Sequence, residues 1–347
     1  MALTQQFKHC GNPFRIDVYK GCDFGCKYCF VNNRGGNLKK IFSIADFSII
    51  ENNFKKAFES KKQTKNITIE MLRHKVPLHL GGMSDPFQSR EREYRLTYKL
   101  LKLTKEYNYP MIISTKTAHI PEEYFEVIDK NLHAFQVSLM SMNETYIRKF
   151  ESRTPTPNER TEFIQLLKDR GFWVGVRIQP LIEIEQAIDV VNELSGLVNY
   201  ITVEHIKIGN DNANKRQLFI DMNLNPKNFK SCGREYELKT DIKRENILKL
   251  KEICKCPIGC GDNDLHELSD SNNCCGIDTI NENFSKWIKY NSMYINQTCD
   301  NTQWHPKCNC SSCINNEGRV SGWYFKDYVD DYIENPRKEG ICKVKID

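Results

Sequence analysis

The chain has 347 residues, of which 39% are hydrophobic, and this length suits one α/β barrel with an appendage. Its net charge of +5 is too small to argue by itself for nucleic-acid binding. No stretch approaches 18 apolar residues and the first residues lack a signal-peptide core, so we expect a soluble, cytoplasmic protein with no membrane partner. In that compartment, fifteen cysteines indicate metal ligands rather than disulfides.

Residues 15–208 alternate between predicted strands and predicted helices. The signal for one helix is strong, since Thr156-Pro157-Asn158-Glu159 supplies a cap, a proline at the first helical position and a glutamate at N3. We predict strands at 15–19, 76–80, 111–114, 134–140, 173–178 and 200–208, and helices at about 43–60, 90–107, 121–130, 156–171 and 183–197. Six such units predict an α/β fold, a partial (β/α)6 TIM-type barrel, with a cysteine-rich C-terminal extension.

Polar residues share one face near the C-terminal end of several predicted strands. Alternation along the strands puts Ser114 with Lys116, and Thr202 with Glu204, on such a face. Gln136 with Ser138, and Gly175 with Arg177, follow the same pattern. Barrel enzymes place their active sites at that end, so we expect these groups to line one. The alternative is a polar interior in which such groups satisfy one another, as Arg177 and Glu204 would.

Three cysteines, Cys22, Cys26 and Cys29, stand in a C-x3-C-x2-C spacing after the first predicted strand. Thiolates at this spacing suit an iron–sulfur cluster, and a cluster with only three protein ligands keeps one iron open to a ligand. The alternative is a zinc knuckle that borrows a distant ligand, but zinc sites more often use paired C-x2-C motifs.

Apart from Cys10, the remaining eleven cysteines lie in the last third of the chain, which divides it into a core at 1–225 and a cysteine-rich region at 226–347. Within that region, residues 256–264 read either as part of a metal-binding group or as a seventh strand that delivers Cys260 and Asp262 to the barrel mouth. Of the adjacent Cys274 and Cys275, at most one is expected to be a ligand. A second metal site, for zinc or an auxiliary iron–sulfur cluster, is predicted at Cys299, Cys308, Cys310 and Cys313.

The cysteine spacing, with Tyr28 before the last cysteine, resembles the signature of radical S-adenosylmethionine (radical SAM) enzymes. The match is closer to the spore photoproduct lyase-like branch over about residues 10–210. The stretches that carry it are Asn12-Pro13-Phe14, Ser114-Thr115-Lys116, Arg177-Ile178-Gln179-Pro180, and Glu151-Ser152-Arg153-Thr154-Pro155 followed by Arg160.

The resemblance implies a [4Fe–4S] cluster on Cys22, Cys26 and Cys29 that binds S-adenosylmethionine, cleaves it reductively and yields a 5′-deoxyadenosyl radical, which abstracts a hydrogen atom. It also implies a one-electron reductant such as flavodoxin or ferredoxin. Cofactor binding would fall to Tyr28, Gly81, Gly82, Ser84, Ser114, Lys116, Ser138 and Arg177. Tyr28 would lie along the adenine, and Arg177 would meet the carboxylate.

Spore photoproduct lyases carry a mid-chain cysteine that returns a hydrogen atom to the product, whereas residues 30–231 here contain none. We therefore expect a hydrogen donor, if needed, from the C-terminal region, with Cys260 as the catalytic candidate, or from a tyrosine. The substrate is expected to be a nucleic acid, a nucleotide or a peptide. The competing hypothesis is a zinc-stabilised, non-catalytic binding module.

Overall fold

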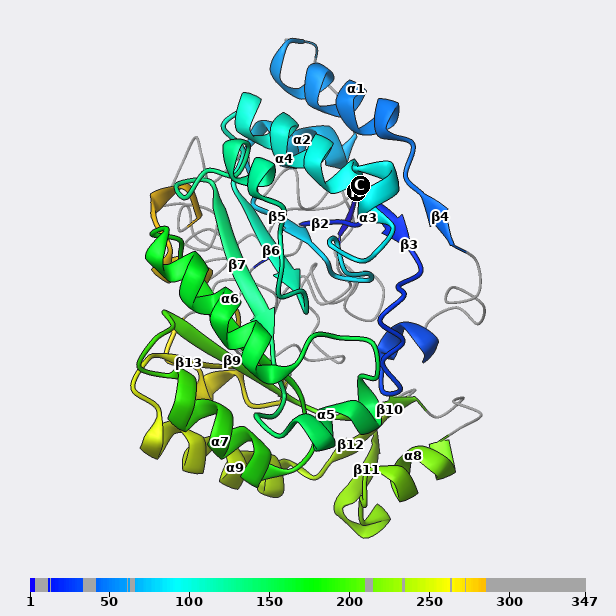
Figure 1. The fold of residues 1–347 in the computed structure, drawn as a ribbon, viewed down its shortest axis with the longest axis vertical. Coiled ribbons are helices and arrows are strands. Elements are labelled where there is room, and N and C mark those ends of the chain that lie inside the picture. The colour runs from blue at the N-terminus through cyan, green and yellow to red at the C-terminus, as the bar shows by residue number, and fades with distance from the viewer. Residues whose placement is uncertain are drawn as a thin grey trace, which may run out of the picture.

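The computed structural model describes residues 1–3, 12, 14–33, 42–60, 62, 66–209, 215–232, 235–262, 264–271 and 273–284 (Figure 1). Its main sheet has the strand order β1-β2-β5-β6-β7-β8-β9-β13. From β2 to β13 all neighbours are parallel, while β1 is antiparallel to β2. The strands are β1 (Ala2–Leu3), β2 (Phe14–Ile16), β5 (Leu78–Leu80), β6 (Met111–Thr115), β7 (His133–Ser138), β8 (Val174–Leu181), β9 (Tyr200–His205) and β13 (Ile258–Cys260).

The helices are α1 (Phe47–Phe58), α2 (Ile67–Arg73), α3 (Glu91–Tyr94), α4 (Leu96–Glu106), α5 (Glu144–Phe150), α6 (Pro157–Asp169), α7 (Ile184–Leu194), α8 (Lys215–Asp221) and α9 (Thr240–Ile253). Most of the helices, among them α4, α6 and α7, lie along the outer face of this curved sheet, whereas α8 lies apart from it (Figure 1). Apolar side chains at alternate strand positions pack against the helices on that face. For example, Phe135 of β7 contacts Phe163 of α6 edge-on, with ring centroids 6.4 Å apart. The predicted partial barrel is confirmed, since the sheet is curved and mostly parallel.

The α6 helix begins as predicted, because Thr156 and Glu159 form a reciprocal capping box. The predicted helix at 90–107 is instead two helices, broken at Arg95, which adopts φ 51°. The buried Glu91 carboxylate explains the break, since it accepts hydrogen bonds from the backbone N–H groups of Thr97 and Tyr98 and so caps α4. The helix predicted at 121–130 is only a 3₁₀ turn at Glu122–Glu126.

The described chain also has two small sheets, one of three strands and one of two. The predicted strand at 200–208 divides after His205, and β10 (Lys207–Gly209) joins a separate sheet with β12 (Glu235–Leu238) and β11 (Phe229–Cys232). The strand predicted at 15–19 likewise divides into β2 and β3 (Tyr19–Lys20), and β3 pairs with β4 (Ser43–Ile44).

The predicted seventh strand is confirmed as β13, which pairs in parallel with β9. Residues beyond 225 therefore contribute to the main sheet, although the domain boundary itself stays a prediction. The second cysteine group, Cys299, Cys308, Cys310 and Cys313, lies outside the described residues. Within the described ranges, no helix combines the length and the apolar character that crossing a bilayer requires.

Candidate active site

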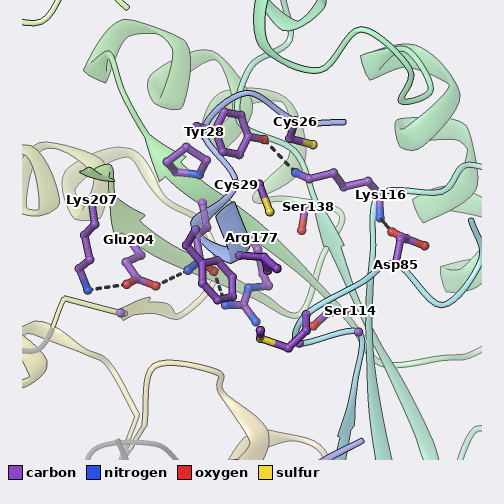
Figure 2. Close-up of a pocket in the computed structure, with 18 of the residues that line it drawn as sticks. Cys26, Tyr28, Cys29, Asp85, Ser114, Lys116, Ser138, Arg177, Glu204 and Lys207 are labelled. Carbon is purple, nitrogen blue, oxygen red and sulfur yellow. Dashed lines mark hydrogen bonds and ion pairs between the residues drawn. The ribbon is translucent and has the colours of Figure 1, made fainter. Parts of the chain in front are cut away.

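A cavity of about 310 Å³ lies at the C-terminal ends of the parallel strands. The cysteines Cys22, Cys26 and Cys29 line it, together with all eight residues expected to bind the cofactor: Tyr28, Gly81, Gly82, Ser84, Ser114, Lys116, Ser138 and Arg177. Figure 2 shows Cys26, Cys29, Tyr28 and Lys116 gathered at one end, with Glu204 and Lys207 beyond Arg177. The fold therefore brings together residues that are distant in the sequence, such as Cys22 and Arg177, which are 155 positions apart.

The cysteine loop is fastened to the strands and helices behind it. The Lys27 backbone N–H donates to the Phe150 carbonyl at the end of α5, at 2.9 Å. The Gln88 side chain donates to the Gly21 carbonyl at 3.0 Å, and Gly21 and Gly25 take φ values of +82° and +65° that favour glycine. Burial raises the pKa of Cys22 to about 12 and that of Cys26 to about 11. These thiols would lose their protons on binding a metal, which stabilises the thiolate.

Glu151 lies beneath the cysteine loop and joins three cavity elements. Its fully buried carboxylate forms ion pairs with Lys116 at 2.9 Å and with the equally buried Arg160 at 2.7 Å. The Tyr28 hydroxyl donates to the same carboxylate, and Lys116 donates to the Tyr28 hydroxyl at 3.1 Å. Despite the opposing effect of burial, the two cations hold the pKa of Glu151 below its ordinary value. Lys116 and Tyr28 are thereby held in fixed positions at the cavity wall.

The turn at 81–85 forms a second wall of the cavity. Gly81 adopts φ +92°, and a Cβ there would lie 2.1 Å from the Ser114 carbonyl oxygen, so only glycine fits. The Asp17 carboxylate accepts from the backbone N–H groups of Met83 at 2.8 Å and Ser84 at 3.3 Å. Asp85 accepts from the Lys116 backbone N–H at 2.6 Å, and burial raises the pKa of Asp85 to about 6.

The polar faces predicted for the strands form a continuous hydrogen-bonded network in the cavity. Ser114 Oγ lies 2.8 Å from His79 Nε2 and donates to Gln136 Oε1 at 3.1 Å. Arg177 also donates to Gln136 Oε1 at 3.1 Å, and it donates to Gln179, which in turn donates to Glu204. Lys207 pairs with Glu204 at 2.6 Å. Arg177 and Glu204 are therefore bridged by Gln179 rather than paired directly.

The geometry gives Cys260 no support as a catalytic residue. Its side chain is buried on β13, with Sγ 3.9 Å from the Asp262 carboxylate, and it is not among the residues that line the cavity. Its neighbour Gly261 does line the cavity, and the adjacent pair Cys274 and Cys275 does so as well. The role of Cys260 stays a prediction.

Asp262 also turns away from the cavity. Its carboxylate lies 2.7 Å from His205 Nδ1 and 3.8 Å from the fully buried Lys243. These contacts hold β13 against β9 and α9.

Sequence reasoning missed the roles of Glu151, Asp17 and Asp85 in fixing the site. The stretch that begins at Glu151 was recognisable as a motif, but nothing local to it identifies Tyr28, which is 123 residues away, as its partner.

The residues present fit an iron–sulfur cluster and a polar ligand. Among the described residues, no group of three or more His, Cys, Asp or Glu side chains is arranged to hold a single metal ion. Cys22, Cys26 and Cys29 line one cavity, so they could supply thiolate ligands to a polynuclear cluster in which each thiolate binds a different iron. Asn12 and the Nε atom of Arg15 are buried at the same cavity with no hydrogen-bond partner in the described chain. Orphaned polar groups of this kind favour a polar ligand.

Comparison with known proteins identifies the family. The family model described as the Radical SAM superfamily matches residues 16–191, just over half of the chain. An uncharacterised protein of Mycobacterium bovis and one of Mycobacterium tuberculosis are each 26% identical over 183 residues, which is 49% of this chain and 50% of each relative. The chain thus spans about half the length of the curated relatives it matches.

Solved structures with a similar fold include spore photoproduct lyase. A cysteine-to-serine mutant of that protein aligns with a TM-score of 0.54 and 15% identity, covering 70% of this chain and 73% of the other. A double mutant with bound AdoMet and dinucleoside spore photoproduct aligns with a TM-score of 0.53 and 15% identity, covering 72% and 76%. At this identity the likeness establishes a shared fold. The family model, which covers the cysteine loop and the parallel strands β5 to β8, shows that the chain belongs to the radical SAM superfamily.

Proposed function

We propose that the chain is an enzyme that binds a [4Fe–4S] cluster through Cys22, Cys26 and Cys29 and uses S-adenosylmethionine to abstract a hydrogen atom from a substrate. The observation that carries this proposal is that the three thiols share one cavity with every polar residue expected to hold the cofactor. When bound, the cluster and S-adenosylmethionine would together supply a 5′-deoxyadenosyl radical. Family membership favours this function over a zinc-stabilised binding module.

Within this proposal, the residues of the chain position the cofactor and hold its charges. Tyr28 and Lys116 are locked by Glu151, so they form a rigid wall beside the thiols. The 81–84 turn presents backbone groups and the Ser84 hydroxyl for an amino group, and Ser138 offers a further hydroxyl. Arg177 supplies a cation for the carboxylate, because a charged donor makes the stronger hydrogen bond to a carboxylate.

The substrate class that we propose is a nucleotide or nucleic acid. Support comes from the fold shared with spore photoproduct lyase, which has been solved with a dinucleoside photoproduct. The alternative substrate is a peptide, which an auxiliary cluster on Cys299, Cys308, Cys310 and Cys313 would favour. We further propose a cytoplasmic enzyme that receives electrons from flavodoxin or ferredoxin.

The test is anaerobic reconstitution of the full chain with iron and sulfide, followed by metal analysis and assay of S-adenosylmethionine cleavage. The wild-type chain should bind about four or more irons and release 5′-deoxyadenosine on reduction. Cys26→Ala should lose the first cluster and the cleavage, whereas Cys232→Ala, on exposed β11, should retain both. Cleavage that is undiminished in Cys26→Ala, or a wild-type chain that binds only zinc, would overturn the proposal.

A further inference from the structure

Two adjacent cysteines outside the cysteine loop also line the cavity. Cys274 and Cys275 both line the cavity, and their Sγ atoms are 3.6 Å apart. Cys275 is buried, with 5% of its surface exposed. Neither residue belongs to the cluster motif, and no strand pattern in the sequence indicates where they lie. A close thiol pair at a radical-generating cavity is a chemical feature that cluster and cofactor binding leave unused.

The turn that carries the pair is built to hold it in place. Thr202 of β9 donates to the Cys274 carbonyl at 2.7 Å, and Asn273 Oδ1 accepts from the Cys275 backbone N–H at 3.0 Å. Two glycines permit the close approach. A Cβ at Gly259 would lie 2.4 Å from the Cys274 carbonyl oxygen, and one at Gly276, where φ is +64°, would lie 2.4 Å from the Tyr200 ring.

Cys275 also contacts the polar network of the cavity through its backbone. The Gln136 side chain donates to the Cys275 carbonyl at 3.3 Å, and Gln136 is the residue that accepts from Arg177 and Ser114. The Sγ atoms of Cys274 and Cys275 lie 3.6 Å apart and either can donate to the other, so the pair can share one proton. In that state the pair combines a thiol and a thiolate in direct contact.

We propose that Cys274 and Cys275 are a hydrogen-atom donor pair that quenches carbon-centred radicals formed in this cavity. This inference rests on the proposed function. In the step, the S–H bond of Cys275 breaks homolytically and a C–H bond forms on the radical, which leaves a thiyl radical on Cys275. The Cys274 thiolate shares the unpaired electron in a two-centre sulfur–sulfur bond. One electron from a low-potential reductant of the flavodoxin or ferredoxin class, with one proton, then restores one thiol and one thiolate.

The experiment needs no knowledge of the substrate, because the 5′-deoxyadenosyl radical itself serves as the probe. Reconstituted enzyme is reduced with dithionite in D₂O, with S-adenosylmethionine and no added substrate, and the deuterium content of 5′-deoxyadenosine is measured by mass spectrometry. Exchange places deuterium on the thiols, so wild-type product should contain deuterium. Cys275→Ser should lose it, because the stronger O–H bond of serine is a poor hydrogen-atom donor and protium must then come from C–H bonds.

The chain offers a matched control in a second close pair. Cys254 and Cys256 have Sγ atoms 3.8 Å apart but do not line the cavity, so Cys254→Ser should leave the deuterium content unchanged. Equal deuterium in wild type and Cys275→Ser would overturn the inference while leaving the proposed function intact. The proposed function itself fails if no 5′-deoxyadenosine forms at all.

A second readout does not depend on turnover. S-adenosylmethionine should slow alkylation of Cys274 and Cys275 by iodoacetamide in the reconstituted wild-type enzyme, as followed by peptide mass spectrometry, and should leave Cys254 unaffected. Because this measurement uses no variant, it decides the case even if Cys275→Ser does not fold. Equal alkylation rates with and without the cofactor would place the pair outside the cofactor's reach and contradict the inference.

Discussion

Replacing Arg160 with methionine should destabilise the fold severely, because it removes a charge from a fully buried ion pair. Arg160 and Glu151 are both 0% exposed at the side chain, with the guanidinium 2.7 Å from the carboxylate. Arg160 also donates to the Ser138 carbonyl at 2.8 Å. Arg160→Met leaves Glu151 buried with Lys116 as its only cation among the described residues, and leaves the Ser138 carbonyl without this donor.

The magnitude follows from the burial. Breaking one side of a buried ion pair costs about 3–5 kcal/mol of unfolding free energy. We expect about 3 kcal/mol, the lower end, because Lys116 at 2.9 Å still compensates part of the Glu151 charge. A matched surface control is Lys249→Met, whose partner Glu245 is 66% exposed and which should cost less than about 1 kcal/mol.

The assay is equilibrium unfolding in urea, monitored by circular dichroism with all thiols kept reduced. Adding Glu151→Leu to Arg160→Met should restore part of the lost free energy, because the double variant no longer buries a carboxylate with incomplete compensation. A loss below about 1 kcal/mol in Arg160→Met, equal to the surface control, would show that the carboxylate is adequately held by Lys116 alone and would refute this reasoning.

Two further predictions concern a glycine and a buried histidine. Gly81→Ala should destabilise the chain by about 1–3 kcal/mol in the same assay, from the positive φ and the clash with Ser114, whereas Gly82→Ala should cost less, since its added Cβ meets only a flexible arginine side chain at 3.3 Å; equal costs would contradict the geometry. Burial lowers the pKa of His133 to about 3. Below pH 6.5 the unfolded chain therefore binds a proton at this histidine that the folded chain does not bind. The free energy of unfolding should fall as the pH drops from 6.5 toward 3, at up to about 1.4 kcal/mol per pH unit. His133→Asn should flatten the dependence of unfolding free energy on pH between about 6.5 and 4, and an unchanged slope would show that another group carries it.

Sequence reasoning worked where the determinants are local. The capping box at Thr156 and Glu159 is contained in four residues. The period-two alternation that places Ser114 and Arg177 at the cavity can be recognised within each single strand. It failed where a distant partner decides the structure. The continuous helix expected through Arg95 is interrupted because Glu91 caps the second half and is itself held by Tyr19, 72 residues earlier.

The same limit applies to the site. The three cysteines of the loop were identifiable because their spacing is local. The role of Glu151 in holding the site can be identified only from the structure, because its partners Tyr28 and Lys116 lie 123 and 35 residues away in the sequence. Cys274 and Cys275 follow no strand or helix period, and what places them at the cavity is the fit of their turn against Tyr200.

The charges in the cavity distinguish two of its cations, Lys116 and Arg177. Lys116 already forms an ion pair with Glu151 at 2.9 Å, and Glu204 already forms one with Lys207 at 2.6 Å. Arg177 instead donates to the neutral amides of Gln136 and Gln179, and no carboxylate in the described ranges lies within ion-pair distance of it. Its guanidinium is therefore oriented without being neutralised, and an oriented charge can form a strong bond to an arriving anion at little reorganisation cost. Under the proposed function, the polar interior and the binding site, which the sequence presented as alternatives, would be parts of one arrangement in which the amides of Gln136 and Gln179 orient Arg177 for a ligand carboxylate.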